Sequence, residues 1–372
     1  MQITAAILDR IGDPGPYAET RPLRLAQVDL GEPQHGELLV RIDAAGICHS
    51  DLSVVNGDRP RPMPMALGHE AAATVMRAGD PKSRFEAGDR VVLAFLPACG
   101  HCASCGSGHG FLCAPAAQAN GAGRMLRGGH RLREGSGEVF HHLGVSAFAT
   151  HAVIDERSAV KVPGDIAPEI AALFGCAVLT GVGAVLNTAM VRPGESVAIY
   201  GLGGVGLSSL LGAMVAGAEP IVAIDPFPWK RQLALELGAT VAVDPSEAAA
   251  AIAAVPGGGV DVAIETAGKA EVLVQAYRAT KRGGRTVTVG LPNPAEMLSI
   301  PAVSLVGDGK TLAGSYMGSS IPSRDVPRYI ALWRAGRLPV DRLLTSVSPL
   351  SEINRLMDEL ASGGAIRQIV TP

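Results

Sequence analysis

The six cysteines of this 372-residue chain fall into a cluster of four and a separated pair. The cluster is CGHCASCGSGHGFLC and holds Cys99, Cys102, Cys105 and Cys113. Four thiolates at this spacing can close a tetrahedral shell around zinc, which would make residues 95–115 a compact structural lobe. A redox pair or two disulfides are the alternatives, and thiols kept reduced in the cytoplasm favour the metal.

The remaining cysteines stand alone, Cys48 in GICHSD and Cys176 in FGCAVLT. A lone cysteine is more often a small buried hydrophobic residue than a ligand. A histidine, His69 in LGHE, accompanies them in the same half of the chain. Two thiolates and one imidazole leave a fourth position open, as catalytic zinc requires. The joint fit of the three residues therefore predicts a second, open zinc site.

Length and composition indicate about two soluble domains with a large core, because 47% of the residues are hydrophobic and 18% are charged. The formal net charge is only -3 and the basic residues are scattered, which argues against a nucleic-acid partner. The first residues, MQITAAILDR, lack the pattern of a signal peptide. We therefore expect a cytoplasmic protein with no membrane partner.

The first part of the chain is rich in short apolar or alternating runs, which predict strands. These runs lie at residues 3–10, 22–30, 37–47, 90–95 and 148–154. The segment Ala114–Glu138 shows little periodicity and is expected to be a long surface loop. Amphipathic helices are expected at 326–335 and 351–362, after the chain has changed character near residue 312.

From about residue 170 the pattern alternates between strand and helix, which predicts an α/β fold with a doubly wound parallel sheet. Val197–Ala218 carries no charged residue and is long enough to cross a bilayer. Its glycine-rich turn GLGGVG instead favours a strand, a turn and a buried helix.

The glycines Gly201, Gly203 and Gly206 form G-x-G-x-x-G between an apolar strand and a helix, the context of a dinucleotide-binding turn. Asp225 follows at the end of the next strand, about 20 residues on, where a carboxylate binds the adenosine ribose. The alternative for Asp225 is a simple turn residue. A carboxylate there would repel a ribose phosphate, so NAD is favoured over NADP, and nicotinamide chemistry implies hydride transfer.

The chain resembles the zinc-dependent medium-chain dehydrogenase/reductase family, of the long-chain zinc alcohol dehydrogenase type. Six motifs carry the resemblance across the whole chain, besides the four-cysteine lobe: GICHSD, GHE, FGCAVLTG, GLGGVG, GSYMG and AIRQIV. The resemblance implies a GroES-like β-rich catalytic domain at 1–177 with the zinc lobe, a Rossmann cofactor domain at 178–317, and a return to the catalytic domain at 318–372.

The resemblance also implies roles for residues near the open zinc. Cys48, His69 and Cys176 hold this catalytic zinc, and Glu70 coordinates it transiently. Asp51 orients His69, as carboxylates do behind metal-bound histidines. Ser50 takes the proton of the alcohol.

Two further sets of residues are implied by the same resemblance. The cofactor set is His49, Thr180, Gly201, Gly203, Gly204, Val205, Gly206, Asp225, Lys230 and Arg367. The substrate-pocket set is Phe95, His142, Leu143, Leu291 and Tyr316. His142 departs from the apolar aromatic that is usual at its position, and it admits a more polar pocket.

The proton relay departs from the family pattern, because Ser53 stands where well-known relatives place a terminal histidine. A serine is no base near neutral pH, so the proton is expected to leave by water or another group. The sequence after the fourth lobe cysteine, CAPAAQ, also lacks the arginine of glutathione-dependent formaldehyde dehydrogenases.

These features predict a reversible alcohol dehydrogenase with two zinc ions per chain and NAD, acting on primary or secondary alcohols or, in reverse, aldehydes and ketones. A thiol-dependent formaldehyde dehydrogenase is the nearest alternative. A zinc-bearing binding module would show a basic face or tandem cysteine motifs, and a zinc-free reductase would lack Cys48, His69 and Cys176. The family implies a homodimer, with a homotetramer as the alternative.

Overall fold

The structure is a computed structural model that describes residues 1–372. Its internal contacts define two compact units. Unit 1 comprises Met1–Cys176, Ile321–Pro327 and Leu344–Pro372, and unit 2 comprises Ala177–Ser320 and Arg328–Leu343. The domain limits predicted at 177/178 and 317/318 stay predictions. The two units differ from the predicted domains chiefly because Arg328–Leu343 belongs to unit 2.

Unit 1 contains a closed five-stranded barrel with the order β1-β2-β7-β8-β4. Its strands are β1 (Gln2–Leu8), β2 (Leu23–Leu30), β4 (Met65–Ala66), β7 (Leu132–Glu134) and β8 (Gly137–His141). Alternating burial along parts of β2 matches the period of two that sets one face against the core.

A seven-stranded sheet completes the β structure of unit 1, with the order β10-β6-β5-β3-β18-β17 and β9 paired to β3. The strands are β3 (Glu37–Ile47), β5 (Ala71–Ala78), β6 (Arg90–Leu93), β9 (His151–Asp155), β10 (Ala159–Lys161), β17 (Leu344–Pro349) and β18 (Arg367–Thr371). The C-terminal β18 pairs antiparallel with the end of β3, with Gln368 opposite Ile47 and Ile369 opposite Gly46. This register brings Arg367 to the strand end that leads into Cys48.

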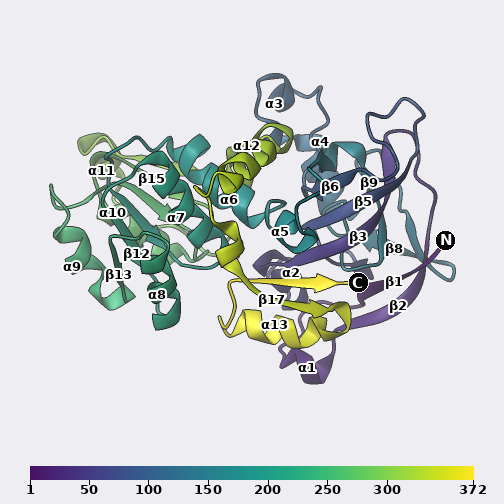
Figure 1. Ribbon diagram of the computed structural model, residues 1–372. Coiled ribbons are helices and arrows are strands. Elements are labelled where there is room, and N and C mark those ends of the chain that lie inside the picture. Colours follow the sequence, from purple (N-terminus) through teal and green to yellow (C-terminus); the bar gives the residue numbers. More distant parts are fainter. The chain divides into compact units, whose positions relative to one another are not determined.

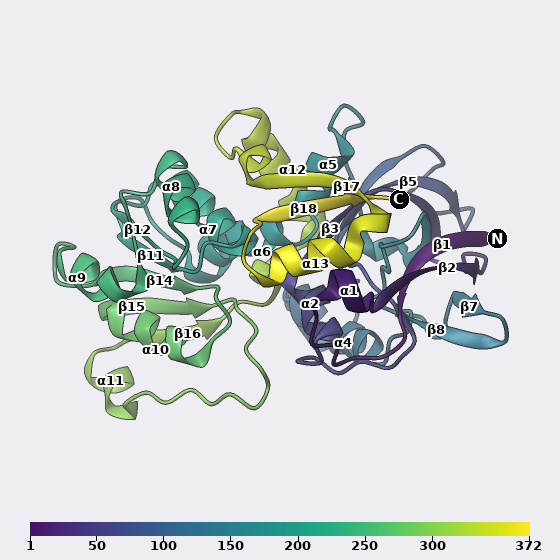
Figure 2. The ribbon, with the colours of Figure 1, turned by 90° about the horizontal axis from the view of Figure 1, so that it is seen from below.

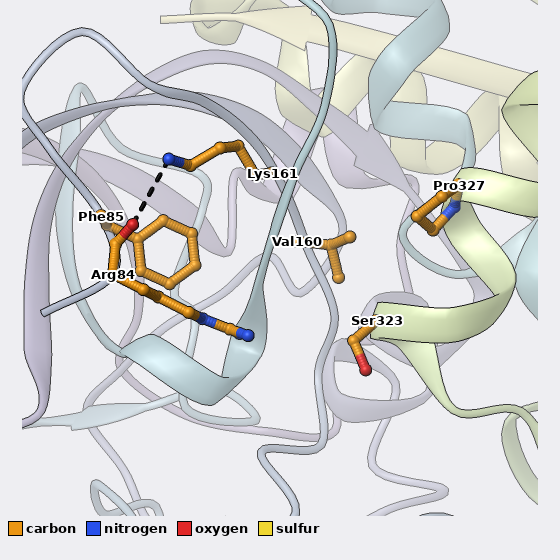
Figure 3. A pocket seen from close by; sticks show the side chains of 6 residues that line it. All are labelled: Arg84, Phe85, Val160, Lys161, Ser323 and Pro327. Carbon is orange, nitrogen blue, oxygen red and sulfur yellow. Dashed lines mark hydrogen bonds between the residues drawn. The ribbon is translucent and has the colours of Figure 1, made fainter.

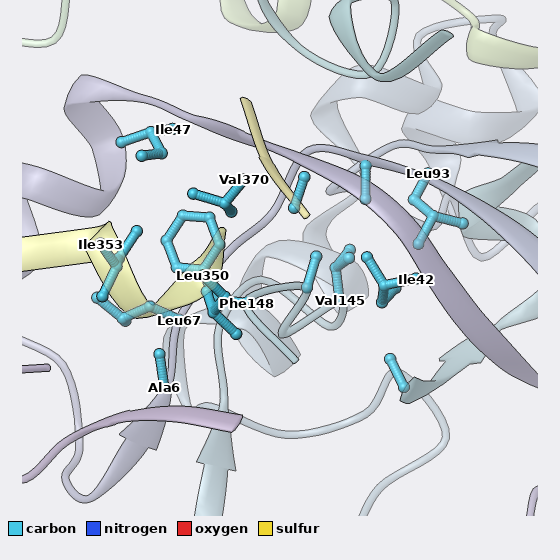
Figure 4. Packing of buried hydrophobic residues seen from close by; sticks show 14 of the residues in the cluster. Ala6, Ile42, Ile47, Leu67, Leu93, Val145, Phe148, Leu350, Ile353 and Val370 are labelled. Atoms are coloured by element: carbon cyan, nitrogen blue, oxygen red, sulfur yellow. The ribbon is translucent and has the colours of Figure 1, made fainter. Parts of the chain in front are cut away.

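The hydrophobic core of unit 1 joins residues that are far apart in the sequence. Figure 4 shows Phe148 among side chains that include Val145, Leu350 and Val370. The helix α13 (Ile353–Ala361) adds Ile353, Leu356, Met357 and Leu360, which share one face at helical spacing. This confirms the amphipathic helix predicted at 351–362.

Unit 2 is built on a six-stranded sheet in which every pair is parallel, with the order β13-β12-β11-β14-β15-β16. The strands are β11 (Val197–Tyr200), β12 (Ile221–Ile224), β13 (Val241–Val243), β14 (Val260–Glu265), β15 (Thr280–Thr288) and β16 (Thr311–Gly314). In order of appearance this is 3-2-1-4-5-6, the doubly wound dinucleotide-binding arrangement. The predicted fold is thereby confirmed for this part.

Helices cover both faces of the unit 2 sheet. Figure 2 shows α7 and α8 on one side and α10 and α11 on the other. The helices assigned to this unit, with α12 extending beyond it, are α6 (Ala177–Gly183), α7 (Gly204–Ala216), α8 (Pro228–Glu236), α9 (Ala248–Ala253), α10 (Ala270–Ala279), α11 (Ala302–Gly307) and α12 (Pro322–Arg334). The segment Val197–Ala218 forms β11, a turn and α7, as expected, and no helix of the structure is long and apolar enough to cross a membrane.

The expectation of a long loop at Ala114–Glu138 is wrong. The segment begins with α4 (Ala114–Gly121) and contains β7 of the barrel. Figure 1 labels α4 and the other short helices of unit 1, which are α1 (Tyr17–Thr20), α2 (His49–Val55), α3 (Ala103–Gly106) and α5 (Pro168–Leu173). The helix carries little apolar periodicity because its residues are small, and tertiary contacts hold it instead.

Candidate metal centres and cofactor site

Three potential metal ligands that are distant in the sequence meet inside unit 1. Cys48 precedes the first turn of α2 directly after β3, and His69 lies between β4 and β5. Cys176 follows α5. Their ligand atoms lie within 4.8 Å of one another, and all three residues are buried. The structure therefore brings together the three residues predicted to hold the open zinc.

The donor set fits zinc. His69 Nε2 is buried and has no hydrogen-bond partner within the protein, although buried polar atoms nearly always have one. Both cysteines are free thiols. A hydrogen bond from Cys176, with support from His69, holds the pKa of the Cys48 thiol well below its ordinary value. A thiolate, a second cysteine and an unpartnered imidazole nitrogen are what a zinc site with two cysteines and one histidine needs.

Asp51 connects the two loops that supply ligands. Its Oδ2 accepts a hydrogen bond from the Cys48 backbone N–H at 3.0 Å, and its Oδ1 lies 3.0 Å from His69 Nδ1. Oδ1 also accepts from the Gly68 N–H at 3.3 Å. Burial alone would raise the pKa of Asp51, but His69 and His142 hold it below its ordinary value. A charged Asp51 thus fixes the proton of His69 on Nδ1 and leaves Nε2 for a metal.

Glu70 and Arg367 form a buried ion pair beside this cluster. Arg367 Nη2 donates to Glu70 Oε1, while Glu70 Oε2 and Arg367 Nε have no hydrogen-bond partner. Burial raises the pKa of Glu70 even though Arg367 opposes the shift. A Cβ at Gly46 would overlap the Glu70 carboxylate, so the close approach of β3 requires glycine there. The pyrophosphate role predicted for Arg367 stays a prediction.

The four-cysteine lobe forms a closed ligand set. The sulfur atoms of Cys99, Cys102, Cys105 and Cys113 lie within 4.8 Å of one another. Backbone N–H groups already point at them, since Cys99 N donates to Cys113 Sγ at 3.2 Å. Arg157 ties the lobe to unit 1 by donating to the Cys99 carbonyl at 2.8 Å. Four sulfur donors with no open position fit a structural zinc.

The glycine turn of unit 2 leaves space where a ligand must approach. A Cβ added to Gly203 would have no atom within 4 Å, whereas one added to Gly206 would overlap the Gly201 carbonyl. Gly203 precedes the first turn of α7, and Gly204, Val205 and Gly206 begin that helix. The second glycine is therefore open toward solvent and the third is closed by packing, as a pyrophosphate cradle requires.

Asp225 directly follows β12 and contacts this turn, and Lys230 lies in the first turn of α8. Asp225 Oδ2 accepts from the Leu202 N–H at 2.7 Å, and Oδ1 accepts from the Phe227 N–H at 2.9 Å. The Lys230 ammonium lies over the Phe227 and Trp229 rings at 4.7 and 5.4 Å from their centroids, and burial lowers its pKa. Asp225 thus connects the glycine turn to the strand end where an adenosine would lie.

The other predicted cofactor residues are spread over both units. Thr180 lies in α6, and the adjacent Gly181 packs on the Val205 carbonyl, which places α6 beside the start of α7. His49 is exposed in α2 of unit 1 and lies one residue beyond Cys48.

The predicted pocket residues divide between the units. Phe95 and His142 both meet the His69 ring edge-on, with centroids 5.6 and 5.4 Å away. Leu143 is buried in the same unit, with its backbone in the left-handed region at φ 52°. Leu291 and Tyr316 belong to unit 2, where they are partly exposed.

The structure places Ser50 close to the ligand Cys48 and the Ser53 hydroxyl on a backbone carbonyl of α2. The Ser50 hydroxyl lies 3.9 Å from Cys48 Sγ. The Ser53 hydroxyl donates to the His49 carbonyl at 2.8 Å, within the helix α2. The hydroxyl proton of Ser53 is therefore used in a hydrogen bond within α2.

The sequence pattern did not single out two contacts near the site. Asn120 of α4 is buried and donates to the Phe95 carbonyl at 2.8 Å, which ties the segment expected to be a loop to a pocket residue. His142 Nδ1 lies 3.2 Å from Asp51 Oδ1. The unusual histidine at 142 was a signal for the second contact, whereas nothing in the alanine-rich α4 indicated the first.

Figure 3 shows a separate pocket in unit 1, formed by Arg84, Phe85, Val160, Lys161, Ser323 and Pro327. Lys161 is paired with Asp89 at 2.7 Å and donates to the Arg84 carbonyl. None of the lining residues is a cysteine, histidine or carboxylate. This pocket is therefore not the place of the metal chemistry.

Comparisons with known proteins agree with this arrangement. Residues 34–164 match the family model described as the alcohol dehydrogenase GroES-like domain, and residues 204–334 match the zinc-binding dehydrogenase model. The geraniol dehydrogenase of Castellaniella defragrans is 38% identical over 98% of this chain and 96% of its own length. An S-(hydroxymethyl)glutathione dehydrogenase of Synechocystis is 34% identical over 94% of this chain and 96% of its own.

Solved structures give the same result. The benzyl alcohol dehydrogenase of Acinetobacter calcoaceticus has a TM-score of 0.92 at 32% identity, covering 100% of this chain and 99% of its own. A zinc-binding dehydrogenase of Sinorhizobium meliloti bound to NADP has a TM-score of 0.81 at 27% identity, covering 100% of both chains.

These matches and the site geometry define the class, a zinc- and nicotinamide-dependent oxidoreductase that acts on alcohols. The chain belongs to the zinc-dependent medium-chain dehydrogenase/reductase family, among its zinc-binding alcohol dehydrogenases. The predicted family, the GroES-like and Rossmann fold, and the zinc and nicotinamide cofactors are confirmed.

Proposed function

We propose that the protein is an NAD-dependent alcohol dehydrogenase that converts a primary or secondary alcohol to its aldehyde or ketone, reversibly. The reaction moves a hydride from the alcohol carbon to the nicotinamide ring and releases the hydroxyl proton. The observation that carries the proposal is the buried Cys48–His69–Cys176 cluster with its unpartnered His69 Nε2. The same chain also has a glycine turn, Gly201–Gly206, with open space at Gly203 for a dinucleotide.

Each residue of the cluster has a part in this proposal. Cys48, His69 and Cys176 would hold the zinc, which when bound supplies Lewis-acid stabilisation of negative charge on oxygen. Asp51 keeps the His69 proton on Nδ1. Ser50, 3.9 Å from Cys48 Sγ, would take the alcohol proton. Ser53 would play no part in onward transfer, because its hydroxyl donates to the His49 carbonyl.

The preference for NAD is proposed from Asp225. Its two carboxylate oxygens accept hydrogen bonds from the Leu202 and Phe227 backbone N–H groups, which fix the side chain at the strand end. A fixed negative charge there would repel a ribose phosphate. One similar solved structure is bound to NADP, so we argue the preference for NAD from Asp225 and not from the family alone.

A thiol-dependent formaldehyde dehydrogenase is the second candidate, favoured by the S-(hydroxymethyl)glutathione dehydrogenase relative. The segment after Cys113 argues against it, since Ala114–Gly121 forms α4 without an arginine. We also propose a homodimer, which the resemblance to the family supports, with a homotetramer as the alternative. The cytoplasmic location stays a prediction.

One assay separates the candidates. NADH formation is measured with a panel of alcohols that includes geraniol and benzyl alcohol, and with formaldehyde in the presence and absence of glutathione. We expect turnover of one or more alcohols with NAD, and no stimulation of formaldehyde oxidation by the thiol. Turnover of formaldehyde alone, and only with the thiol, would replace the first candidate by the second.

A further inference from the structure

Asp51 makes more polar contacts than are required to orient one histidine. Besides His69 and the backbone N–H groups of Cys48 and Gly68, its Oδ1 faces His142 Nδ1 at 3.2 Å. The carboxylate is fully buried, so no solvent competes for it. Its position therefore depends on three hydrogen bonds, from the Cys48 and Gly68 backbone N–H groups and His69 Nδ1, and on the approach of His142.

The His142 ring is fixed from two sides. Its plane lies at 89° to the His69 plane with the centroids 5.4 Å apart. Its backbone is held in a tight turn, because the His142 N–H donates to Ser146 Oγ and the His142 carbonyl accepts from the N–H of Val145 and Ser146. Both Leu143 and Ser146 adopt positive φ in this turn. The ring is thus presented to Asp51 by the fold.

The contact is a close polar approach whose geometry falls short of a hydrogen bond in this structure. His142 Nδ1 is buried and has no other acceptor. A buried N–H beside a carboxylate is most stable when it donates to it.

We propose that His142 is a positioning residue for the metal ligand His69, acting through the carboxylate of Asp51. The inference rests on the proposed zinc site. His142 holds Oδ1 where it keeps the proton of His69 on Nδ1. Groups behind a metal ligand typically change metal affinity by about 10- to 100-fold when they are removed. Retention of zinc by the site of Cys48, His69 and Cys176 therefore depends on His142, and retention by the four-cysteine lobe does not.

The test follows release of zinc from the holoenzyme into an excess of a chromogenic chelator. The variants are His142→Phe, which removes the N–H, and His142→Asn, which restores a donor. The matched control is His141→Phe, because His141 is equally buried but accepts a hydrogen bond from the Arg131 N–H and does not face Asp51. We expect two zinc ions in the wild type, with one leaving about tenfold faster in His142→Phe. The release rate of the slower zinc ion is unchanged, and His142→Asn brings the release rate of the faster ion part of the way back to the wild-type value.

A spectroscopic readout separates positioning from general loss of stability. Co²⁺ is exchanged into the more labile site, and its ligand-field absorption reports the coordination geometry. A shifted spectrum in His142→Phe, with an unshifted one in His141→Phe, is the expected result. Loosening of the fold alone would leave the bound Co²⁺ spectrum unchanged.

Four outcomes would overturn the inference. Equal release rates in the wild type and His142→Phe, or equal acceleration of both zinc ions, would leave His142 without a specific role. Three zinc ions per wild-type chain would make Asp51, His69 and His142 a metal site, since their ligand atoms also lie within 4.8 Å. A single zinc ion in the wild type would instead refute the proposed catalytic site, and the inference with it.

Discussion

Two alanine substitutions in the glycine turn are expected to separate cofactor binding from folding. Gly203→Ala places a methyl group where nothing lies within 4 Å. Gly206→Ala places the same group against the Gly201 carbonyl and within 2.8 Å of Thr266 Oγ1. The two sites are three residues apart in one turn, so each variant is the control for the other.

The structure gives the size of both effects. At Gly203 the backbone has φ -75° and ψ -171°, which alanine adopts freely. Alanine is a poorer helix cap than glycine, which lowers the free energy of unfolding by about 0.5–1 kcal/mol. Alanine also reduces the conformational entropy of the unfolded chain, which raises it by about 0.4–1 kcal/mol, so the two effects nearly cancel. A pyrophosphate forced to retreat loses a hydrogen bond to a charged group worth ~1.5–3 kcal/mol. The Kd of NADH should then rise about 10- to 150-fold.

At Gly206 we expect alanine to lower the stability of the fold. The methyl group overlaps a carbonyl oxygen and has no space to move into, so the free energy of unfolding falls by about 1–3 kcal/mol. Thermal unfolding without cofactor measures this term, and titration of NADH fluorescence measures binding. If Gly203→Ala bound NADH within twofold of the wild type, the turn would not be the pyrophosphate cradle.

Three further predictions concern other parts of the molecule. His141 is buried beside His130 and Arg131, and burial first, then these charges, lowers its pKa from 6.5 to about 3. Below pH 6.5 the unfolded chain therefore binds a proton at His141 that the folded chain does not, so the free energy of unfolding falls as the pH falls. The loss reaches about 2 kcal/mol at pH 5. Urea unfolding at several pH values checks this, since the free energy of unfolding of His141→Phe should depend less on pH. Asp225→Ala should raise NADP turnover relative to NAD about tenfold or more, since a charge repulsion is removed; an unchanged ratio of kcat/KM values contradicts the assignment. Cys113→Ser should lose the zinc ion of the lobe, with lower thermal stability, and metal analysis that still finds two ions per chain would count against a four-cysteine zinc site.

The strand and helix pattern of unit 2 could be predicted from the sequence because each apolar strand is followed by a helix with its own turn signal. Val197–Ala218 is an example, where GLGGVG marks the change from β11 to α7. The segment 114–138 could not be predicted, because α4 consists of small residues without an apolar stripe. It is held by tertiary contacts such as the Asn120 hydrogen bond to Phe95.

The grouping of Cys48, His69 and Cys176 could be predicted from their joint fit to a zinc site with two cysteines and one histidine, and the structure brings the three residues together. Their partners depended on topology. Arg367 meets Glu70 because β18 pairs with the end of β3, a pairing between residues about as far apart as the chain allows. His142 faces Asp51 because a turn in which Leu143, Gly144 and Ser146 have positive φ presents its ring. The contact of Arg367 with Glu70 leaves no local signal in the sequence, whereas the unusual histidine at position 142 is the one local signal for the contact with Asp51.

Removing and restoring the more labile zinc ion, while NADH formation from an alcohol is followed, tests the proposed catalytic centre most directly. With that ion removed and the other retained, we expect the rate to fall at least about 100-fold, since Lewis-acid stabilisation is worth several kcal/mol. NADH binding should be unchanged, and added zinc should restore the rate. Alcohol oxidation at the wild-type rate in the chain that has lost this ion would contradict the claim that Cys48, His69 and Cys176 form the catalytic centre.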